Sequence, residues 1–289
     1  MKKLIYWAVV AAMFVSCKNS QDEPKPQPED TKIPINITTS IMRATDSAFE
    51  LGDKVGIYVV NSPNQLAASG NHVDNMGFTY SPGWTPDKEI YWKDETTQAA
   101  FYCYYPYTQN ISTTNHKFIA KADQSSVENY KASEFLWGKT NFLSPTESAV
   151  PITVNHTFSN ALVVVEPGDG FTAESLAASN VEVKLCNLKT EATINMATGE
   201  ATAGGAPTTI KPLNEGTYYR ALVVPQTVEE SALIIVTIDG VSYTLTKGFT
   251  FKPNTQHRFT VTVNKVSNGV NIGIGGWEID ETDNGGVAE

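Results

Sequence analysis

The chain has 289 residues, in which 31 Asp and Glu outnumber 21 Lys and Arg, for a formal net charge of −10. After the first few residues it contains no run of basic side chains. This argues against binding to nucleic acid or anionic lipid headgroups, which select positive patches. The length suits two modest domains or one large all-β domain.

The first residues read as a secretory signal peptide. Two lysines precede an apolar run over residues 4–15, and this run is shorter than the roughly 20 residues that a membrane-spanning helix needs. The run ends in FVSC (residues 14–17), which resembles a bacterial lipobox. An ordinary cleavable signal with a chance cysteine is the alternative. We expect residues 1–16 to be removed and Cys17 to carry lipid that holds the protein on the outer membrane.

A polar segment follows the lipidation site. Residues 18–32 contain Pro, Gln, Asp, Glu, Lys and small polar residues, with no apolar side chain to bury. Such a stretch cannot repay the entropy of ordering, and its prolines keep it extended. We therefore expect residues 17–32 to be a disordered tether. Its acidic pair, Asp22 and Glu23, resembles the surface-export signal of some Gram-negative lipoproteins.

The N-terminal half of the remaining chain alternates with period two, which predicts strands. Ile33, Ile35 and Ile37 predict a half-buried strand over residues 33–41. Further strands are expected within residues 49–60 and 98–107, the second of them aromatic and ended by a proline. The alternation is lost in polar loops before residue 148. We therefore expect domains at residues 33–148 and 149–289.

The C-terminal half alternates more regularly. Asp239-Gly240 accepts the positive φ angles of a type I′ turn, so residues 233–246 predict a β-hairpin. The one helical candidate is residues 172–179. Many short strands with hardly a helix are typical of β-sandwiches, so we predict an all-β fold. The other strands are expected at residues 150–154, 161–165, 181–185, 218–224 and 259–263.

Two cysteines remain for the folded part. An exported protein permits a disulfide. Cys103 and Cys186, however, fall on strands of different expected domains. We favour two free thiols that pack as small apolar residues.

Several segments together resemble the fimbrillin-like proteins of Gram-negative type V pili. The resemblance implies two tandem transthyretin-like β-sandwich domains and a role as pilus stalk subunit, anchor or tip adhesin. It also implies assembly by strand exchange, in which proteolysis after an arginine removes the first strand and a strand of another subunit replaces it. The matching segments are FELGDKVGIYVV (49–60), YWKDETTQAAFYCYYPY (91–107), FLWGK (135–139), NHTFSNALVVV (155–165), TINMATGE (193–200), YYRALVVPQ (218–226) and HRFTVTV (257–263), followed by Trp277.

An edge strand over residues 33–41 provides a physical basis for such an exchange. It would hide an apolar groove and a row of backbone donors and acceptors, which another strand could occupy by β-augmentation. Arg43 is the only Arg or Lys between Lys32 and Lys54, so a trypsin-like protease would find it first. The alternative is a plain loop arginine, which is the commoner role of a lone basic residue in a polar linker. Residues 270–279 suit strand donation, although they could equally close their own sheet.

No motif indicates catalysis or a cofactor. The four histidines, at positions 72, 116, 156 and 257, have none of the short spacings typical of metal sites, and GIGG at residues 273–276 precedes no helix. We therefore expect no enzyme activity, no metal site and no cofactor.

A second hypothesis is a surface lipoprotein that binds host or other glycans through an aromatic platform. Such rings are more often core than platform, because burying each removes about 150–250 Å² from water. The candidate rings are Trp84, Tyr91, Trp92, Tyr102 and Tyr104.

Overall fold

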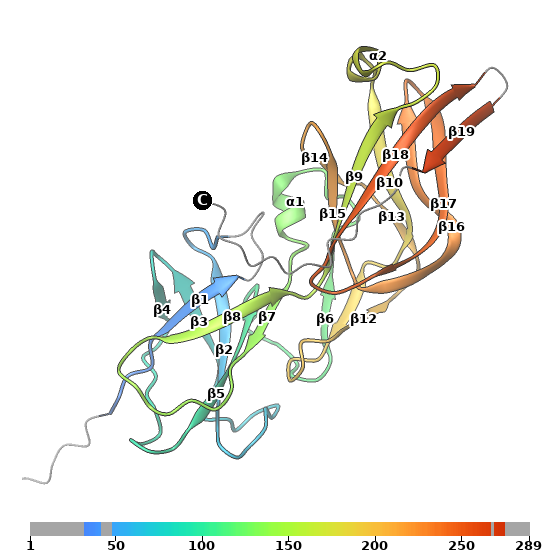
Figure 1. Ribbon diagram of the computed structural model, residues 1–289. Coiled ribbons are helices and arrows are strands. Elements are labelled where there is room, and N and C mark those ends of the chain that lie inside the picture. Colours follow the sequence, from blue (N-terminus) through green and yellow to red (C-terminus); the bar gives the residue numbers. More distant parts are fainter. Residues whose placement is uncertain (1–31, 42–47, 267–268, 275–289) are drawn as a thin grey trace, which may run out of the picture. The chain divides into compact units, whose positions relative to one another are not determined.

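The computed structural model describes residues 32–41, 48–266 and 269–274, and in these residues the fold is almost entirely β (Figure 1). This confirms the all-β prediction. No helix in these ranges has the length and apolar character needed to cross a membrane. The strands are β1 (Ile37–Ile41), β2 (Lys54–Asn61), β3 (Val73–Tyr80), β4 (Trp84–Pro86), β5 (Ala99–Tyr105), β6 (His116–Ile119), β7 (Leu136–Lys139), β8 (Val150–His156), β9 (Ser159–Pro167), β10 (Val181–Leu188), β11 (Glu191–Ile194), β12 (Ala201–Gly204), β13 (Thr208–Ile210), β14 (Leu213–Asn214), β15 (Tyr219–Val223), β16 (Gln226–Ile238), β17 (Val241–Phe251), β18 (Gln256–Val266) and β19 (Gly269–Ile274), and the helices are α1 (Val127–Lys131) and α2 (Ala173–Ala178).

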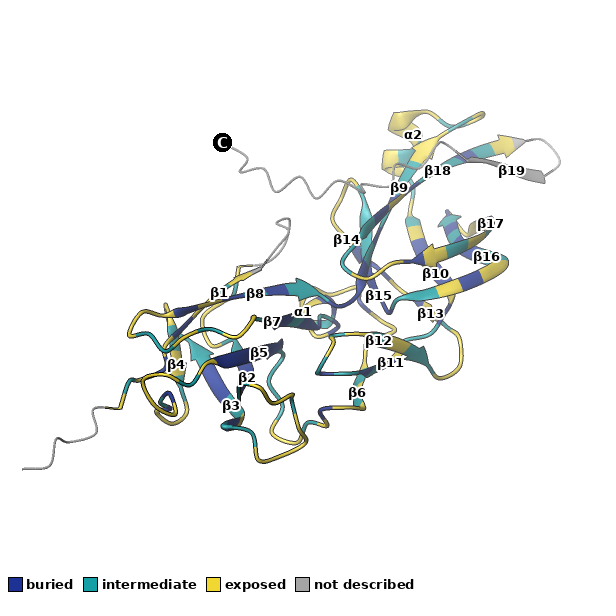
Figure 2. Cartoon of the chain, turned by 60° about the horizontal axis from the view of Figure 1, so that its bottom comes forward, coloured by how far each residue is buried: buried dark blue, intermediate teal, exposed yellow. Residues whose placement is uncertain are grey.

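The N-terminal sheet has the strand order β1-β8-β7-β5-β2-β3-β4. Its central strands are buried on both faces, as the dark blue of β2 and β5 in Figure 2 shows. On one face Val55, Ile57 and Phe101 join a cluster that also takes side chains from β1, β3 and β8, so the sheet curls around its own core. On the other face Tyr58 and Tyr104 enter a second cluster with residues of the C-terminal half.

β8 belongs to this sheet. It pairs with β1 through a parallel ladder from Ile37↔Val150 to Ile41↔Val154, and with β7 through Leu136↔His156. The domain boundary expected near residue 148 would instead put β8 at the start of the second domain. The chain leaves the N-terminal sheet only after His156.

Two C-terminal sheets, β13-β10-β16-β17 and β14-β15-β9-β18-β19, share one buried cluster. Val183 and Val236 come from the first sheet, and Val163 and Val261 from the second. Alternating inward apolar side chains on two facing sheets are the arrangement of a β-sandwich. The predicted hairpin is confirmed, since β16 and β17 meet at Ile238↔Val241. Between them Asp239 and Gly240 have φ angles of 49° and 85°.

A three-stranded sheet, β12-β11-β6, joins the two halves of the chain, and we call it the junction sheet. Its β6 comes before β8 in the chain and its β11 comes after β9, and the two pair from Glu191↔Ile119 to Ile194↔His116. Trp137 adds a hydrogen bond from its Nε1 to the carbonyl oxygen of Met196 (2.8 Å). The halves are therefore joined by backbone pairing as well as by apolar packing.

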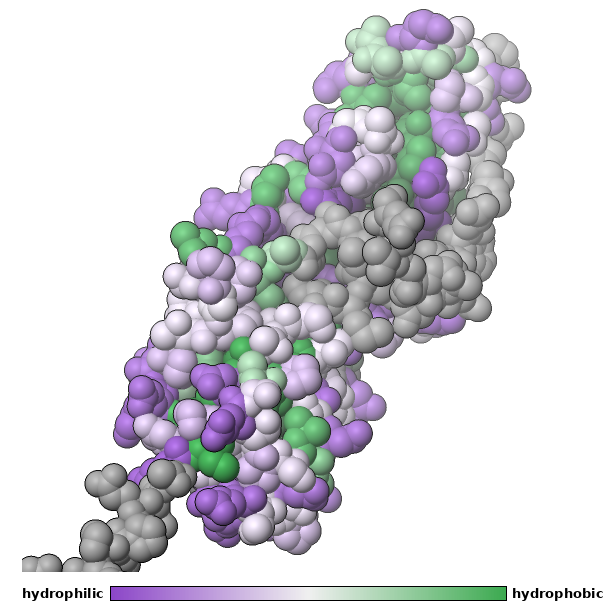
Figure 3. All heavy atoms as spheres, turned by 60° about the vertical axis from the view of Figure 1, so that its left-hand side comes forward, coloured by the Kyte–Doolittle hydropathy of each residue, from purple (hydrophilic) through white to green (hydrophobic). Residues whose placement is uncertain are grey.

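The large apolar side chains that are exposed come from separate segments. In the face drawn in Figure 3, hydrophilic residues cover much of the surface and apolar residues lie between them in small patches. Small scattered apolar residues are normal on a protein surface. Among the described residues the large exposed ones are Leu51, Ile119, Val127, Phe142 and Val241.

His257, in the C-terminal core, makes stability depend on pH. Its side chain is buried, and its Nε2 accepts a hydrogen bond from the backbone N–H of Lys252 (3.0 Å). Burial, assisted by the charge of Lys252, lowers the pKa of His257 to about 4, from an ordinary value of 6.5. The unfolded chain therefore takes up a proton first as the pH falls. This contribution to stability is complete above the unfolded pKa and is lost as the pH falls toward the folded one.

We expect the free energy of unfolding to fall by about 2 kcal/mol through His257 when the pH is lowered from about 7 to about 4.5. Urea denaturation at a series of pH values measures this. The variant His257→Gln is expected to start from a lower stability and to show a shallower decline over the same range. A decline as steep as that of the wild type would contradict the assignment to His257.

Candidate functional site

The segment that contains β1 makes backbone hydrogen bonds on two sides. Its first residues pair with the chain after β4, where the N–H of Ile35 donates to the carbonyl oxygen of Ile90 (2.9 Å) and that of Trp92 donates to Ile33 (2.9 Å). Pro34 lies opposite Tyr91 between these two bonds, so its missing N–H costs no hydrogen bond. From residue 37 onward the segment pairs with β8 instead.

The inward side chains of this segment fill the N-terminal core. Ile35 and Ile37 are 2% and 4% exposed, and Ile33 packs against the same cluster. The outward side chains of Asn36 and Thr38 are exposed. Burying an isoleucine is worth about 1.5–3 kcal/mol relative to leaving it exposed. The predicted half-buried strand is therefore confirmed in its inward and outward sides, and β1 lies at the end of the sheet order, although as a ladder it begins only at Ile37.

Beside β1 lies a cluster of partly buried aromatic rings, formed by Phe49, Tyr80, Trp84 and Tyr105. The ring of Trp84 lies 4.9 Å from that of Phe49 and 5.2 Å from that of Tyr80. The Nε1 of Trp84 donates a hydrogen bond to the Oγ1 of Thr39 (2.9 Å). Thr39 comes before residues 42–47 and Phe49 comes after them, so one indole contacts the chain on both sides of that segment.

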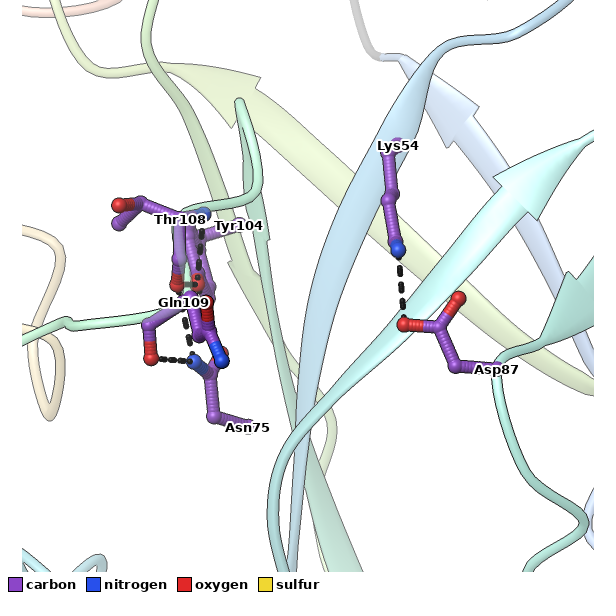
Figure 4. Close-up of polar contacts among 6 residues, drawn as sticks. All are labelled: Lys54, Asn75, Asp87, Tyr104, Thr108 and Gln109. Atoms are coloured by element: carbon purple, nitrogen blue, oxygen red, sulfur yellow. Dashed lines mark hydrogen bonds and ion pairs between the residues drawn. The ribbon is translucent and has the colours of Figure 1, made fainter.

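A further polar contact reaches the aromatic cluster, and an ion pair links β2 to the residue after β4. The hydroxyl of Tyr105 donates to the Oδ1 of Asp53 (3.2 Å). Burial and, next, the Asp53 carboxylate raise the pKa of Tyr105 to about 12, so the phenol is protonated at neutral pH. In Figure 4, Lys54 of β2 reaches across β3 to Asp87 (2.7 Å). A Cβ on Gly77 would lie 2.4 Å from both of these side chains, so the glycine makes room for the ion pair.

A second network holds the chain where it leaves β5. The hydroxyl of Tyr104 donates to the Oδ1 of Asn75 (2.7 Å), and the Nδ2 of Asn75 donates to the carbonyl oxygens of Thr108 (2.9 Å) and Gln109 (3.1 Å; Figure 4). Tyr104 is fully buried, and burial raises the pKa of its phenol. These contacts fix the start of the connection from β5 to β6, and thus to the junction sheet.

The predicted lipidation and cleavage sites, Cys17 and Arg43, lie outside the residues that the structure describes, as does Trp277. The candidate donor strand lies partly within the described residues. Its residues up to Ile274 form β19, which pairs antiparallel with β18 from Val261↔Ile274 to Val266↔Gly269. This part of the segment closes its own sheet, and residues 275–279 lie outside the described ranges.

Most of the candidate glycan platform is core. Trp92 and Tyr102 are each 4% exposed and Tyr104 is fully buried, so none of these rings presents a face to solvent. Trp84 and Tyr91 are partly exposed. The interpretation of such rings as packing residues is confirmed for the three buried ones.

The histidines and cysteines occupy structural positions. His156 contacts Glu134 (Nδ1 to Oε2, 2.9 Å), and the Nε2 of His72 lies 2.7 Å from the carbonyl oxygen of Tyr91. Cys103 and Cys186 are buried free thiols, as expected. Across the described ranges, no three His, Cys, Asp or Glu side chains lie close enough to one another to hold a metal ion.

Sequence reasoning did not find the two-sided pairing of the first strand or the contact between Thr39 and Trp84. No motif marks either. Thr39 continues the alternating series of Ile33, Ile35 and Ile37, and a threonine within an otherwise apolar series is the one available signal of a polar contact there.

Comparison with known proteins places the chain in a family. The fimbrillin-like family matches residues 43–277. A protein of Bacteroides uniformis provisionally named fimbrium subunit Fim1C is 23% identical over 296 residues, which cover 96% of this chain and 95% of that protein.

Solved structures show the same fold. A crystal structure from Bacteroides uniformis, provisionally described as a cell adhesion protein, has a TM-score of 0.67 at 20% identity and covers 86% of this chain and 98% of that one. One from Bacteroides ovatus with the same description has a TM-score of 0.68 at 18% identity and the same coverage. Because the family match extends over most of the sequence, the chain belongs to the fimbrillin-like family.

Proposed function

We propose that this protein is a structural or adhesive subunit of a cell-surface type V pilus, whether stalk, anchor or tip, and that it joins other subunits by strand exchange. In this role it is not an enzyme. The lipid on Cys17 would hold it on the outer membrane after residues 1–16 are removed, with residues 17–32 as the tether. Membership of the fimbrillin-like family supports the fimbrial part of this proposal.

The position of β1 is the observation that carries strand exchange. β1 is the edge strand of its sheet, and removing residues 33–41 would uncover the pockets of Ile35 and Ile37 and the backbone groups of β8. Its last residue is Ile41, two positions before Arg43. A cut after Arg43 would make Ala44 the first residue of the remaining chain, and Phe49, five positions later, belongs to the aromatic cluster.

The sheets and the buried clusters that they enclose support two sandwich domains of transthyretin-like type. We place the passage between them after His156 rather than near residue 148, because β8 pairs within the N-terminal sheet. The adhesive function, if the protein is a tip subunit, would use a host or glycan ligand. Of the proposed glycan-binding rings, only Trp84 and Tyr91 are partly exposed.

Digestion of the mature chain with an arginine-specific protease tests strand exchange. The chain has three arginines, Arg43, Arg220 and Arg258. We expect one early cut after Arg43, followed by a ladder of oligomers on a native gel, and no ladder from Arg43→Gln. Arg258→Gln is the matched control, because Arg258 is exposed on β18 and its loss should leave the ladder unchanged. A cut chain that stays monomeric and keeps its first strand would contradict the proposal.

The membrane attachment has its own test. A Cys17→Ala chain, expressed with its signal peptide, is expected to move from the outer-membrane fraction to the soluble fraction and to lose incorporation of radiolabelled palmitate. Each buried methylene contributes about 0.8 kcal/mol to membrane binding, so losing the acyl chains removes the attachment. Cys186→Ala serves as control. Continued labelling of the Cys17→Ala chain would refute the assignment.

A further inference from the structure

The hydrogen bond between Trp84 and Thr39 connects the two ends of the N-terminal sheet. β1 is the first strand in the sheet order and β4, which begins at Trp84, is the last. The indole N–H donates to the Oγ1 of Thr39 at 2.9 Å in a partly buried position. The edge-to-face contact with Phe49 fixes the plane of the same indole. The donor is therefore held in place by the sheet, and the acceptor is supplied by the strand in the groove.

Such a donor distinguishes between strands. Position 39 follows Ile33, Ile35 and Ile37 on the inward side, so three apolar pockets are followed by one polar pocket. A hydroxyl at this position satisfies the indole, whereas a valine of the same shape leaves the N–H without an acceptor. In this partly buried position an indole N–H left without an acceptor loses a hydrogen bond, whereas removing the donor and the acceptor together leaves no group unpaired.

We propose that this groove accepts a strand from a different subunit and selects it by a hydroxyl. The strand runs parallel to β8, with apolar side chains at the places of Ile33, Ile35 and Ile37 and a serine or threonine at the place of Thr39. This inference rests on the strand-exchange function proposed above, because the contact can select a strand only if β1 leaves.

The sequence of this chain explains why the partner is a different subunit. Its own candidate donor has Val270, Ile272 and Ile274 in the apolar places but Gly276 in the fourth. Glycine has no side-chain acceptor for the indole. Residues 269–274 are moreover already paired with β18 as β19. A second copy of this chain therefore offers a strand that fits the apolar pockets and fails at the polar one.

Peptide competition tests the selection on the mature chain cut after Arg43. A fluorescent peptide of residues 33–41 is displaced by unlabelled versions: the natural sequence, Thr39→Val, and Thr38→Val as the control, because Thr38 is exposed on the same strand. We expect Thr39→Val to compete about five- to tenfold less well, from the net worth of one hydrogen bond, and Thr38→Val to match the natural peptide. A Trp84→Phe chain keeps the ring but lacks the donor, and on it the natural and Thr39→Val peptides are expected to compete equally.

A gain of binding gives the complementary measurement. A peptide of residues 268–279 with Gly276→Thr is expected to compete better than its natural sequence on the wild-type chain, and equally on the Trp84→Phe chain. If all peptides bind the wild-type chain alike, the hydroxyl selection is wrong and strand exchange stands. If no peptide enters the groove of the cut chain, strand exchange and the selection fail together.

Discussion

Replacing Gly138 by alanine is expected to lower the free energy of unfolding by about 3 kcal/mol or more, because overpacking against a rigid neighbour is among the costly core changes. Gly138 is a buried residue of β7, the neighbour of β8. A Cβ at this position would lie 2.1 Å from the carbonyl oxygen of Thr153 and 3.0 Å from the Cα of Val154. Both are backbone atoms of β8, so no side-chain rotation relieves the overlap.

The control for this change is Gly204→Ala. Gly204 is also a strand glycine, but a Cβ there would meet no atom within 4 Å. Its replacement is expected to change stability by less than about 0.5 kcal/mol, as for ordinary surface positions. Urea denaturation followed by circular dichroism measures both variants. If Gly138→Ala and Gly204→Ala have equal free energies of unfolding, β7 and β8 can move apart at little cost. In that case β8 is not a rigid neighbour of β1.

Replacing Gln124 by leucine is expected to cost about 3–5 kcal/mol, since each buried backbone group left without a partner costs about 1–3 kcal/mol. The side chain is fully buried. Its Oε1 accepts from the N–H of Leu222 (2.8 Å), and its Nε2 donates to the carbonyl oxygens of Leu222 (2.9 Å) and Lys121 (3.0 Å). One amide side chain thus pairs with the edge of β15 in place of a strand, and joins the segment before α1 to the C-terminal half.

Gln124→Glu refines this prediction. The carboxylate keeps the shape and the bond from the N–H of Leu222, but it directs an oxygen at two carbonyl oxygens. We expect a loss at neutral pH at least as large as that of Gln124→Leu, and partial recovery as the pH falls and the acid becomes a donor. Gln98→Leu is the control, because Gln98 is exposed and makes one long contact, with Ser144 (3.3 Å). A loss at Gln98 as large as that at Gln124 would contradict the argument.

The helices illustrate how far local signals extend. Residues 172–179 were predicted as a helix, and α2 forms there with Thr172 as its N-cap, in a capping box with Ser175. The short helix α1 was not predicted, although Ser126 is its N-cap and accepts a hydrogen bond from the backbone N–H of Asn129. A helix of one turn and a half has little periodicity to detect, and Tyr130 is its only buried residue. A tertiary contact stabilises α1 instead: the guanidinium of Arg220 lies over the ring of Tyr130, 4.4 Å from its centroid.

By itself, the sequence determined the class of the fold, the position of most long strands and the side of each that faces inward. Val55, Ile57 and Val59 are buried on one face of β2 and Tyr58 and Val60 on the other, as their alternation predicts. An alternation of period two shows which side chains of a strand face away from water, and each strand shows this for its own two faces. It also determined the family, because the order of the matching segments extends over most of the chain.

Only the tertiary structure decided which strands are neighbours. The backbone N–H and C=O groups are the same at every residue, so alternation does not tell whether β8 pairs with β1 or with a C-terminal strand. For the same reason the sequence contains no sign that Gln124 completes a sheet edge or that Trp84 reaches Thr39. Those contacts arise because folding brings groups from distant positions to a place without water, where each donor needs an acceptor.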